Sequence, residues 1–138
     1  MYILKVTDSF SAAHRLRGYE GKCENLHGHN WKVEAEVHIA AVNEIGISMD
    51  FKAVKTLLKD VLNEYDHRDL NDLPEFGKEN PSAEHIARNI HHRLRARLEG
   101  GGVSRLRVTV WESDNASCIY EELAERPAKA RRRRARVK

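Results

Sequence analysis

Two histidines separated by a single glycine, His27 and His29, are the residues whose types and spacing most directly suggest chemistry. In an extended segment the side chains alternate between two faces, so both imidazoles would point to the same side of a strand. Imidazole nitrogen is a good ligand for zinc, and a site with three histidines would leave the fourth coordination position open. A third ligand would have to be another of the chain's eight histidines.

Cys23 precedes His27 by four residues and adds a second kind of reactive group. Its thiolate could be a fourth ligand that closes a metal site, or a reactive thiol beside an open site. Histidine pairs of this spacing are also common on solvent-exposed strands that bind nothing, so the pair alone does not decide between these interpretations.

The size and composition of the chain are those of one globular domain, with 138 residues and an ordinary hydrophobic content of 41%. No apolar run approaches the length of a membrane helix, and the N-terminal segment is too short and too soon charged for a signal peptide. We therefore expect a cytoplasmic protein with no membrane contact. In that reducing compartment Cys23 and Cys118 are not expected to form a disulfide.

Positive charge is concentrated at the C-terminal end of the chain. Residues 129–138 carry seven Lys or Arg and no acidic residue, and without them the net charge of +3 becomes about −4. We therefore divide the chain into a domain at residues 1–123 and a basic, flexible tail at residues 124–138. The tail could contact nucleic acid, but no aromatic side chains interleave its charges, which favours a solvated extension.

Hydrophobic alternation predicts the strands that position the candidate residues. Residues 2–12 and 31–39 alternate between apolar and polar side chains, and the first pattern, if continued, places His14 on its apolar face. Shorter alternating runs predict two more strands, over residues 105–112 and 117–123.

Apolar residues at helical spacing predict two helices between these pairs of strands. The first follows an N-cap at Asp50 and ends near residues 65–67, and the second begins after a cap at Ser82. The order ββααββ predicts an α+β fold, with a four-stranded antiparallel sheet and two helices on one face.

Three further histidines, His85, His91 and His92, lie on or beside the second helix among several arginines. Because positive neighbours disfavour the binding of a metal cation, we interpret them as surface histidines and not as ligands. His38, on the polar face of its strand, is interpreted as solvated.

Three other residues have both a structural and a catalytic interpretation. A histidine at a helix end, such as His67, often interacts with the helix dipole, but one that Asp66 orients beside a thiol could relay protons. Glu112, at the end of a strand, is either a surface charge or an acceptor for two N–H groups of a guanidine-like heterocycle.

Six short motifs stand out along the chain: FSAAHRL at residues 10–16, Cys23 followed by HGHN at residues 27–30, MDF at 49–51, DHRDLN at 66–71, NPSAE at 80–84 and WES at 111–113. Together they resemble the 6-pyruvoyl-tetrahydropterin synthase family over residues 1–123. Within this family the resemblance is closest to the bacterial 6-carboxy-tetrahydropterin synthases of queuosine biosynthesis, because only three residues separate Cys23 from His27.

The resemblance implies a tunnelling fold (T-fold), in which three subunits close a barrel and two trimers stack into a homohexamer. It also implies a Zn²⁺ ion held by His14, His27 and His29.

The same resemblance implies that Cys23 is the catalytic thiol and that Glu112 anchors the pterin ring of the substrate. Asp66 and His67 would form a proton relay that is supplied across a subunit interface.

The implied reaction converts 7,8-dihydroneopterin triphosphate to 6-carboxytetrahydropterin with release of acetaldehyde and triphosphate. One alternative is a 6-pyruvoyl-tetrahydropterin synthase, which eliminates triphosphate without cleaving the side chain. A non-enzymatic alternative is a structural zinc module with Cys23 as the fourth ligand and a nucleic-acid-binding tail.

Overall fold

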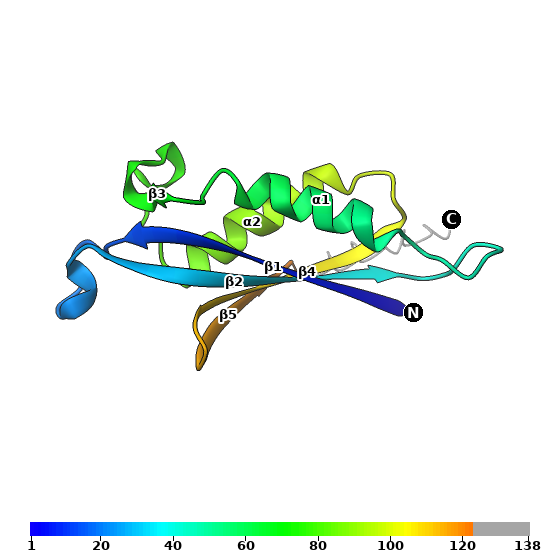
Figure 1. The fold of residues 1–138 in the computed structure, drawn as a ribbon, viewed down its shortest axis with the longest axis horizontal. Coiled ribbons are helices and arrows are strands. Elements are labelled where there is room, and N and C mark those ends of the chain that lie inside the picture. The colour runs from blue at the N-terminus through cyan, green and yellow to red at the C-terminus, as the bar shows by residue number, and fades with distance from the viewer. Residues whose placement is uncertain (123–138) are drawn as a thin grey trace, which may run out of the picture.

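The computed structural model describes residues 1–122, which form one sheet covered by two helices (Figure 1). The expected basic tail at residues 124–138 lies outside the described residues. The elements in chain order are β1 (Tyr2–His14), β2 (His27–Ile39), α1 (Phe51–Leu62), β3 (Arg68–Asp69), α2 (Ala83–Arg97), β4 (Val103–Ser113) and β5 (Ala116–Glu121), and the short 3-10 helices are Lys22–Glu24, Leu70–Asp72 and Pro74–Phe76.

The strands lie in the order β3-β1-β2-β4-β5. The four longer strands pair with one another in antiparallel fashion and both helices lie on one face, which confirms the predicted α+β fold. The sheet has a fifth strand that was not predicted, because β3 pairs in parallel with Ala12 and Ala13 at the edge of β1. A strand of two residues is too short to show an alternating pattern in the sequence.

The hydrophobic core lies between the sheet and the helices. Residues directly opposite each other on antiparallel strands share a face of the sheet. On the face of β2 that points toward the helices, Trp31 and Val33 are fully buried. Leu58 of α1 and Ile90 of α2 are fully buried on the other side of the core. This burial fixes which face of each strand points toward the helices.

Both helices begin directly after the residues that are predicted to cap them. The side chain of Asp50 accepts a hydrogen bond from the backbone N–H of Lys52, and that of Ser82 accepts one from His85. However, α1 ends at Leu62, before the predicted end near residues 65–67. The chain leaves the helix there and turns toward the edge of β1.

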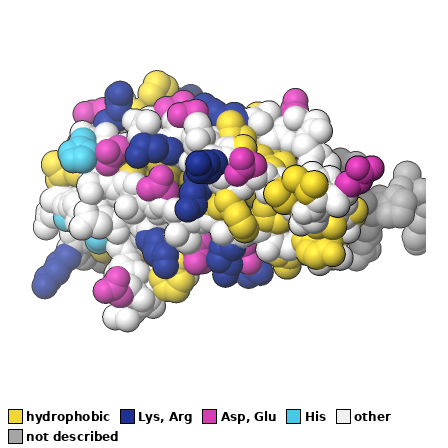
Figure 2. Space-filling view, turned by 45° about the vertical axis from the view of Figure 1, so that its right-hand side comes forward, with side chains coloured by type: hydrophobic (Ala, Val, Ile, Leu, Met, Phe, Trp, Pro, Cys, Tyr) yellow, Lys and Arg dark blue, Asp and Glu magenta, His cyan; other side chains and the backbone are white. Residues whose placement is uncertain are grey.

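Exposed hydrophobic side chains gather at the end of the molecule where β1 begins (Figure 2). They border a depression of about 520 Å³ between the first residues of β1 and the segment that leads into α1. The apolar side chains that line the depression include Tyr2, Ile3, Val42, Ile47 and Phe51.

None of the helices in the described part of the chain has the length and hydrophobicity needed to cross a membrane.

Candidate functional site

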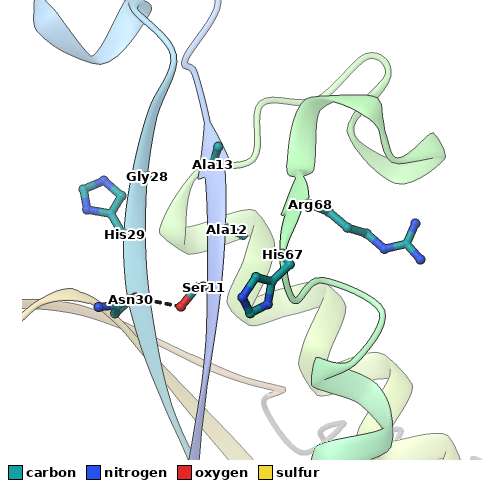
Figure 3. A pocket seen from close by; sticks show the side chains of 8 residues that line it. All are labelled: Ser11, Ala12, Ala13, Gly28, His29, Asn30, His67 and Arg68. Carbon is teal, nitrogen blue, oxygen red and sulfur yellow. Dashed lines mark hydrogen bonds between the residues drawn. The ribbon is translucent and has the colours of Figure 1, made fainter.

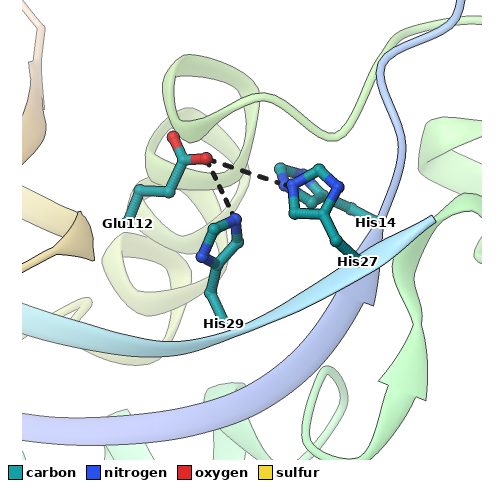
Figure 4. Close-up of side chains that lie close together, drawn as sticks. All are labelled: His14, His27, His29 and Glu112. Carbon is teal, nitrogen blue, oxygen red and sulfur yellow. Dashed lines mark hydrogen bonds and ion pairs between the residues drawn. The ribbon is translucent and has the colours of Figure 1, made fainter. Parts of the chain in front are cut away.

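Three imidazoles converge at the opposite end of the sheet, on the side that faces the helices (Figure 4). His14 is directly opposite His27 in the pairing of β1 with β2, and His29 is opposite Ala12. The structure therefore confirms that His27 and His29 share a face and that His14 follows the apolar side of β1. We call His14, His27 and His29 the imidazole cluster.

Backbone carbonyl groups orient two of these rings. The Nδ1 atom of His14 lies 2.7 Å from the carbonyl oxygen of Pro81, and the Nδ1 atom of His27 lies 2.6 Å from that of Asn25. If each Nδ1–H donates to its carbonyl, each Nε2 carries a lone pair, which is how metal-ligating histidines are commonly held. The two Nε2 atoms lie 3.0 Å apart. Ligand nitrogens of tetrahedral zinc, with bonds of about 2.0–2.1 Å, lie at a similar separation.

Burial keeps two rings of the cluster, those of His14 and His29, in the form that binds metal ions. Burial lowers the pKa of His14, although its hydrogen bond to Pro81 partly opposes this effect. Burial also lowers the pKa of His29. Both rings therefore favour the neutral state, and only a neutral imidazole has a lone pair for a metal.

Glu112 of β4 completes the group on its open side. Its Oε1 atom lies 3.1 Å from Nε2 of His29 and 3.8 Å from Nε2 of His14, and its side chain is 33% exposed. From sequence we expected Glu112 to anchor the pterin ring of the substrate, and the structure also places it beside two of the histidines. The alternation of side chains in β4 could have indicated that Glu112 faces the histidines, because it follows the buried Val108 and Val110 on the same face.

These four side chains fit a divalent metal ion. Their ligand atoms all lie within 4.8 Å of one another, and imidazole and carboxylate are ligands that zinc accepts. Cys23 does not belong to this group, although it was considered as a fourth ligand. The arrangement therefore does not support a closed structural zinc site that contains the cysteine sulfur.

Two asparagine side chains hold the segment that leads to Cys23. The amide of Asn71 accepts from the backbone N–H of Arg15 at 2.9 Å and donates to its carbonyl oxygen at 3.1 Å. Asn80 makes the same pair of bonds with Arg17, both at 2.9 Å. Each side-chain amide thus makes, with one residue of the segment, the N–H and C=O hydrogen bonds that a neighbouring strand would make.

The same segment is tied to the cysteine and to the loop before α2. The backbone N–H of Leu16 donates to the carbonyl oxygen of Cys23 at 2.8 Å. The guanidinium of Arg17 donates to the carbonyl oxygens of Gly77 and Glu79, at 2.9 and 2.8 Å. The position of Cys23 therefore depends on residues 71–80, which lie about 50 positions later in the chain.

Asp66 and His67 contact each other directly, although adjacent residues in a helix do not. His67 adopts a left-handed conformation with φ of 56°, and its Nδ1 lies 2.9 Å from Oδ2 of Asp66. The other Asp66 oxygen accepts the backbone N–H of Ser11 at 2.9 Å, and the N–H of His67 donates to the Ser11 carbonyl. The hydrogen bond from Ser11, followed by that with His67, lowers the pKa of Asp66.

The pair of Asp66 and His67 lies apart from the imidazole cluster within one chain. Figure 3 shows the ring of His29 beside β2 and the ring of His67 beyond β1. Neither Asp66 nor His67 is among the side chains whose ligand atoms converge on His29. A hollow of about 420 Å³ borders this region and is lined by Ser11, Ala12, Ala13, Gly28, His29, Asn30, His67 and Arg68.

Known proteins resemble the chain along almost its whole described length. Residues 3–123 match the family model for 6-pyruvoyl tetrahydropterin synthase. A 6-carboxy-5,6,7,8-tetrahydropterin synthase of Synechocystis sp. is 38% identical over 128 residues, which cover 87% of this chain and 93% of the relative. A dihydroneopterin monophosphate aldolase of Pyrococcus furiosus is 38% identical over 108 residues, which cover 77% and 85%.

A solved structure shares the arrangement of the elements. The 6-pyruvoyl tetrahydropterin synthase of Caenorhabditis elegans superposes with a TM-score of 0.79 at 27% identity, covering 88% of this chain and 96% of that one. The sheet, the helices and the matched sequence agree, and the chain belongs to the 6-pyruvoyl tetrahydropterin synthase family.

Proposed function

We propose that the protein is a zinc-dependent 6-carboxy-5,6,7,8-tetrahydropterin synthase of queuosine biosynthesis. It would convert 7,8-dihydroneopterin triphosphate to 6-carboxytetrahydropterin and release acetaldehyde and triphosphate. The observation that carries this proposal is the imidazole cluster, whose ring nitrogens converge while the Cys23 sulfur stays outside the ligand group. The identity of 38% to a relative of this name supports the choice of reaction within the family.

In this proposal the imidazole cluster holds the metal and Glu112 faces the substrate. A zinc ion bound by His14, His27 and His29 would supply Lewis acidity to the hydroxyl groups of the substrate side chain. The carbonyl partners of His14 and His27 hold these rings in place, so they need not reorganise during the reaction. The carboxylate of Glu112, which is partly exposed beside His29, would accept two N–H groups from the edge of a pterin ring.

Proton transfer is assigned to Cys23 and His67. The Cys23 thiolate would take and return protons at the substrate side chain, and the imidazole of His67 would do so on the other face. Asp66 orients the ring of His67 through the contact of 2.9 Å. Because β1 separates His67 from His29 within one chain, we assign the relay to a neighbouring subunit.

This assignment requires an oligomer, and we propose a homohexamer made of two stacked trimers. The exposed apolar side chains around the depression at the start of β1 support burial against another subunit. They lie at the opposite end of the sheet from the imidazole cluster, so the contact that brings a neighbour's His67 to the cluster would be a separate interface.

The test is incubation of the zinc-loaded protein with 7,8-dihydroneopterin triphosphate, followed by mass spectrometry of the pterin products. We expect 6-carboxytetrahydropterin, whereas a 6-pyruvoyl product would assign the pyruvoyl synthase reaction instead. Cys23→Ala should abolish turnover and retain the metal, and Cys118→Ala should retain both. Full activity of Cys23→Ala would reject the role of the thiol.

An aldolase reaction on dihydroneopterin monophosphate is the second candidate, because the relative of that name is also 38% identical to this chain. The same assay with the monophosphate as substrate separates the two candidates. Turnover of the monophosphate without turnover of the triphosphate would replace the synthase proposal by the aldolase.

A further inference from the structure

A second group of metal-ligating side chains lies where α2 meets the end of β5. His91 and His92 of α2 and Glu122, which follows β5, have ligand atoms within 4.8 Å of one another. We call these residues the α2–β5 group, and none of them belongs to the site described above. The interpretation of His91 as a surface histidine is wrong, because its side chain is only 2% exposed.

The ring of His91 is held like those of the imidazole cluster. Its Nε2 lies 3.0 Å from the carbonyl oxygen of Leu106, to which it can donate. Its Nδ1 is then a buried acceptor that has no hydrogen-bond partner among residues 1–122. Leaving such a group unpaired is costly, and one ring nitrogen bound to a backbone carbonyl is typical of metal-ligating histidines. Burial lowers the pKa of His91, which keeps the ring neutral.

The two other members of the group are open to solvent and lie together. Nε2 of His92 is 3.0 Å from Oε1 of Glu122, and about half of each side chain is exposed. The ring of Tyr120 packs against both imidazoles, with its centroid 5.0 Å from that of His91 and 5.6 Å from that of His92. An ion from solvent can therefore reach the group, and Tyr120 forms one wall of it.

Nearby arginines are engaged with other partners. Arg88 pairs with Glu79, and Arg95 donates a hydrogen bond to the carbonyl oxygen of Val103 at 3.0 Å. Arg95 keeps its positive charge near His91, and the carboxylate of Glu122 supplies a negative charge that opposes it in the group.

We propose that His91, His92 and Glu122 form a second site for a divalent transition-metal ion such as Zn²⁺. Two imidazoles and one carboxylate are a ligand set that zinc uses, and water would fill the fourth position. The ion would tie the end of β5 to α2, far from the proton-transfer residues. Its role would thus be to stabilise this corner of the fold.

The direct test is the number of Zn²⁺ ions bound per chain by the untagged, full-length protein. The protein is stripped with a chelator, equilibrated with Zn²⁺ and freed of excess ion before metal analysis. We expect two ions per wild-type chain and one per chain of either His92→Ala or Glu122→Gln. Glu44→Gln, in an exposed loop, is the matched control and should retain two.

A second measurement isolates the proposed site from the imidazole cluster. A variant with His27→Ala and His29→Ala should still bind one Zn²⁺, and the added ion should raise its melting temperature. Adding His92→Ala should remove both effects. His91→Ala is avoided because the side chain is buried. A wild-type protein that binds one ion, or His92→Ala and Glu122→Gln variants that bind as many ions as the wild type, would overturn the proposal.

Discussion

His14 and His27 face each other across β1 and β2 with their Nε2 atoms 3.0 Å apart, and each ring has its Nδ1 beside a backbone carbonyl oxygen. If both carbonyls receive a proton from Nδ1, two lone pairs point at each other, which is unfavourable unless a proton or a cation lies between them. The backbone thus prepares a cation site before any cation binds.

The first prediction concerns metal affinity at this pair. His27→Ala should weaken Zn²⁺ binding by roughly 100-fold or more, because it removes a ligand that the backbone has already oriented. The measurement is competition with a chromophoric chelator in a His92→Ala background, so that only one site is observed. His38→Ala is the control, and its affinity should not change. Equal affinities of the two variants would show that the metal binds elsewhere.

The second prediction uses the separation of His67 from the imidazole cluster. If the relay is supplied by a neighbouring subunit, oligomers mixed from Cys23→Ala and His67→Ala chains contain sites with both groups intact. Random one-to-one mixing should restore activity at about a quarter of the sites. Each variant alone should be inactive. Mixed oligomers that stay inactive would place Cys23 and His67 of one site in the same chain.

The third prediction separates stability from activity at His67. A left-handed non-glycine residue costs about 1–3 kcal/mol, and glycine would remove this strain at an entropic cost of about 0.5–1 kcal/mol. Because the side chain is 82% exposed, His67→Gly should leave the free energy of unfolding unchanged or raise it. Turnover should fall by about 10²–10⁴-fold with the loss of an acid–base group.

The control for this variant is His92→Gly, measured in the absence of added metal. His92 is an exposed residue inside α2, where glycine costs up to about 1 kcal/mol. Chemical denaturation of both variants gives the comparison. Destabilisation of His67→Gly as large as that of the control would contradict strain at His67.

The fourth prediction concerns the amide that holds the segment before Cys23. Asn80→Ala removes two hydrogen bonds to the backbone of Arg17, so the free energy of unfolding should fall by about 1–2 kcal/mol. Turnover should fall while the metal content stays constant, because Cys23 loses its support. Asn63→Ala, at the exposed end of α1, should change stability by less than about 0.5 kcal/mol. If Asn80→Ala kept full turnover, the hydrogen bonds between Asn80 and Arg17 would not contribute to catalysis.

The parts of the site that follow strand alternation could be predicted from the sequence. His27 and His29 share a parity, and the apolar residues of β1 place His14 on the corresponding face, so only the pairing of two strands was needed to bring them together. The caps at Asp50 and Ser82 were similarly local, because each depends on residues within three positions.

The parts that depend on distant contacts could not be predicted. The contact of Asp66 with His67 requires an early end of α1 and hydrogen bonds to Ser11, which lies 55 positions before Asp66. The burial of His91 results from β4 packing against α2, and its arginine-rich neighbourhood suggested the opposite. Such tertiary effects override local composition.

Trp31 joins the hydrophobic core to the imidazole cluster. It is fully buried, its ring centroid lies 4.9 Å from that of His14 and 5.1 Å from that of His29, and its indole N–H donates to the carbonyl oxygen of Ala12. A change in the charge of these rings should therefore alter the fluorescence of the indole. With the other tryptophan replaced by Trp111→Phe, the emission of one buried side chain would report in real time whether the cluster is occupied.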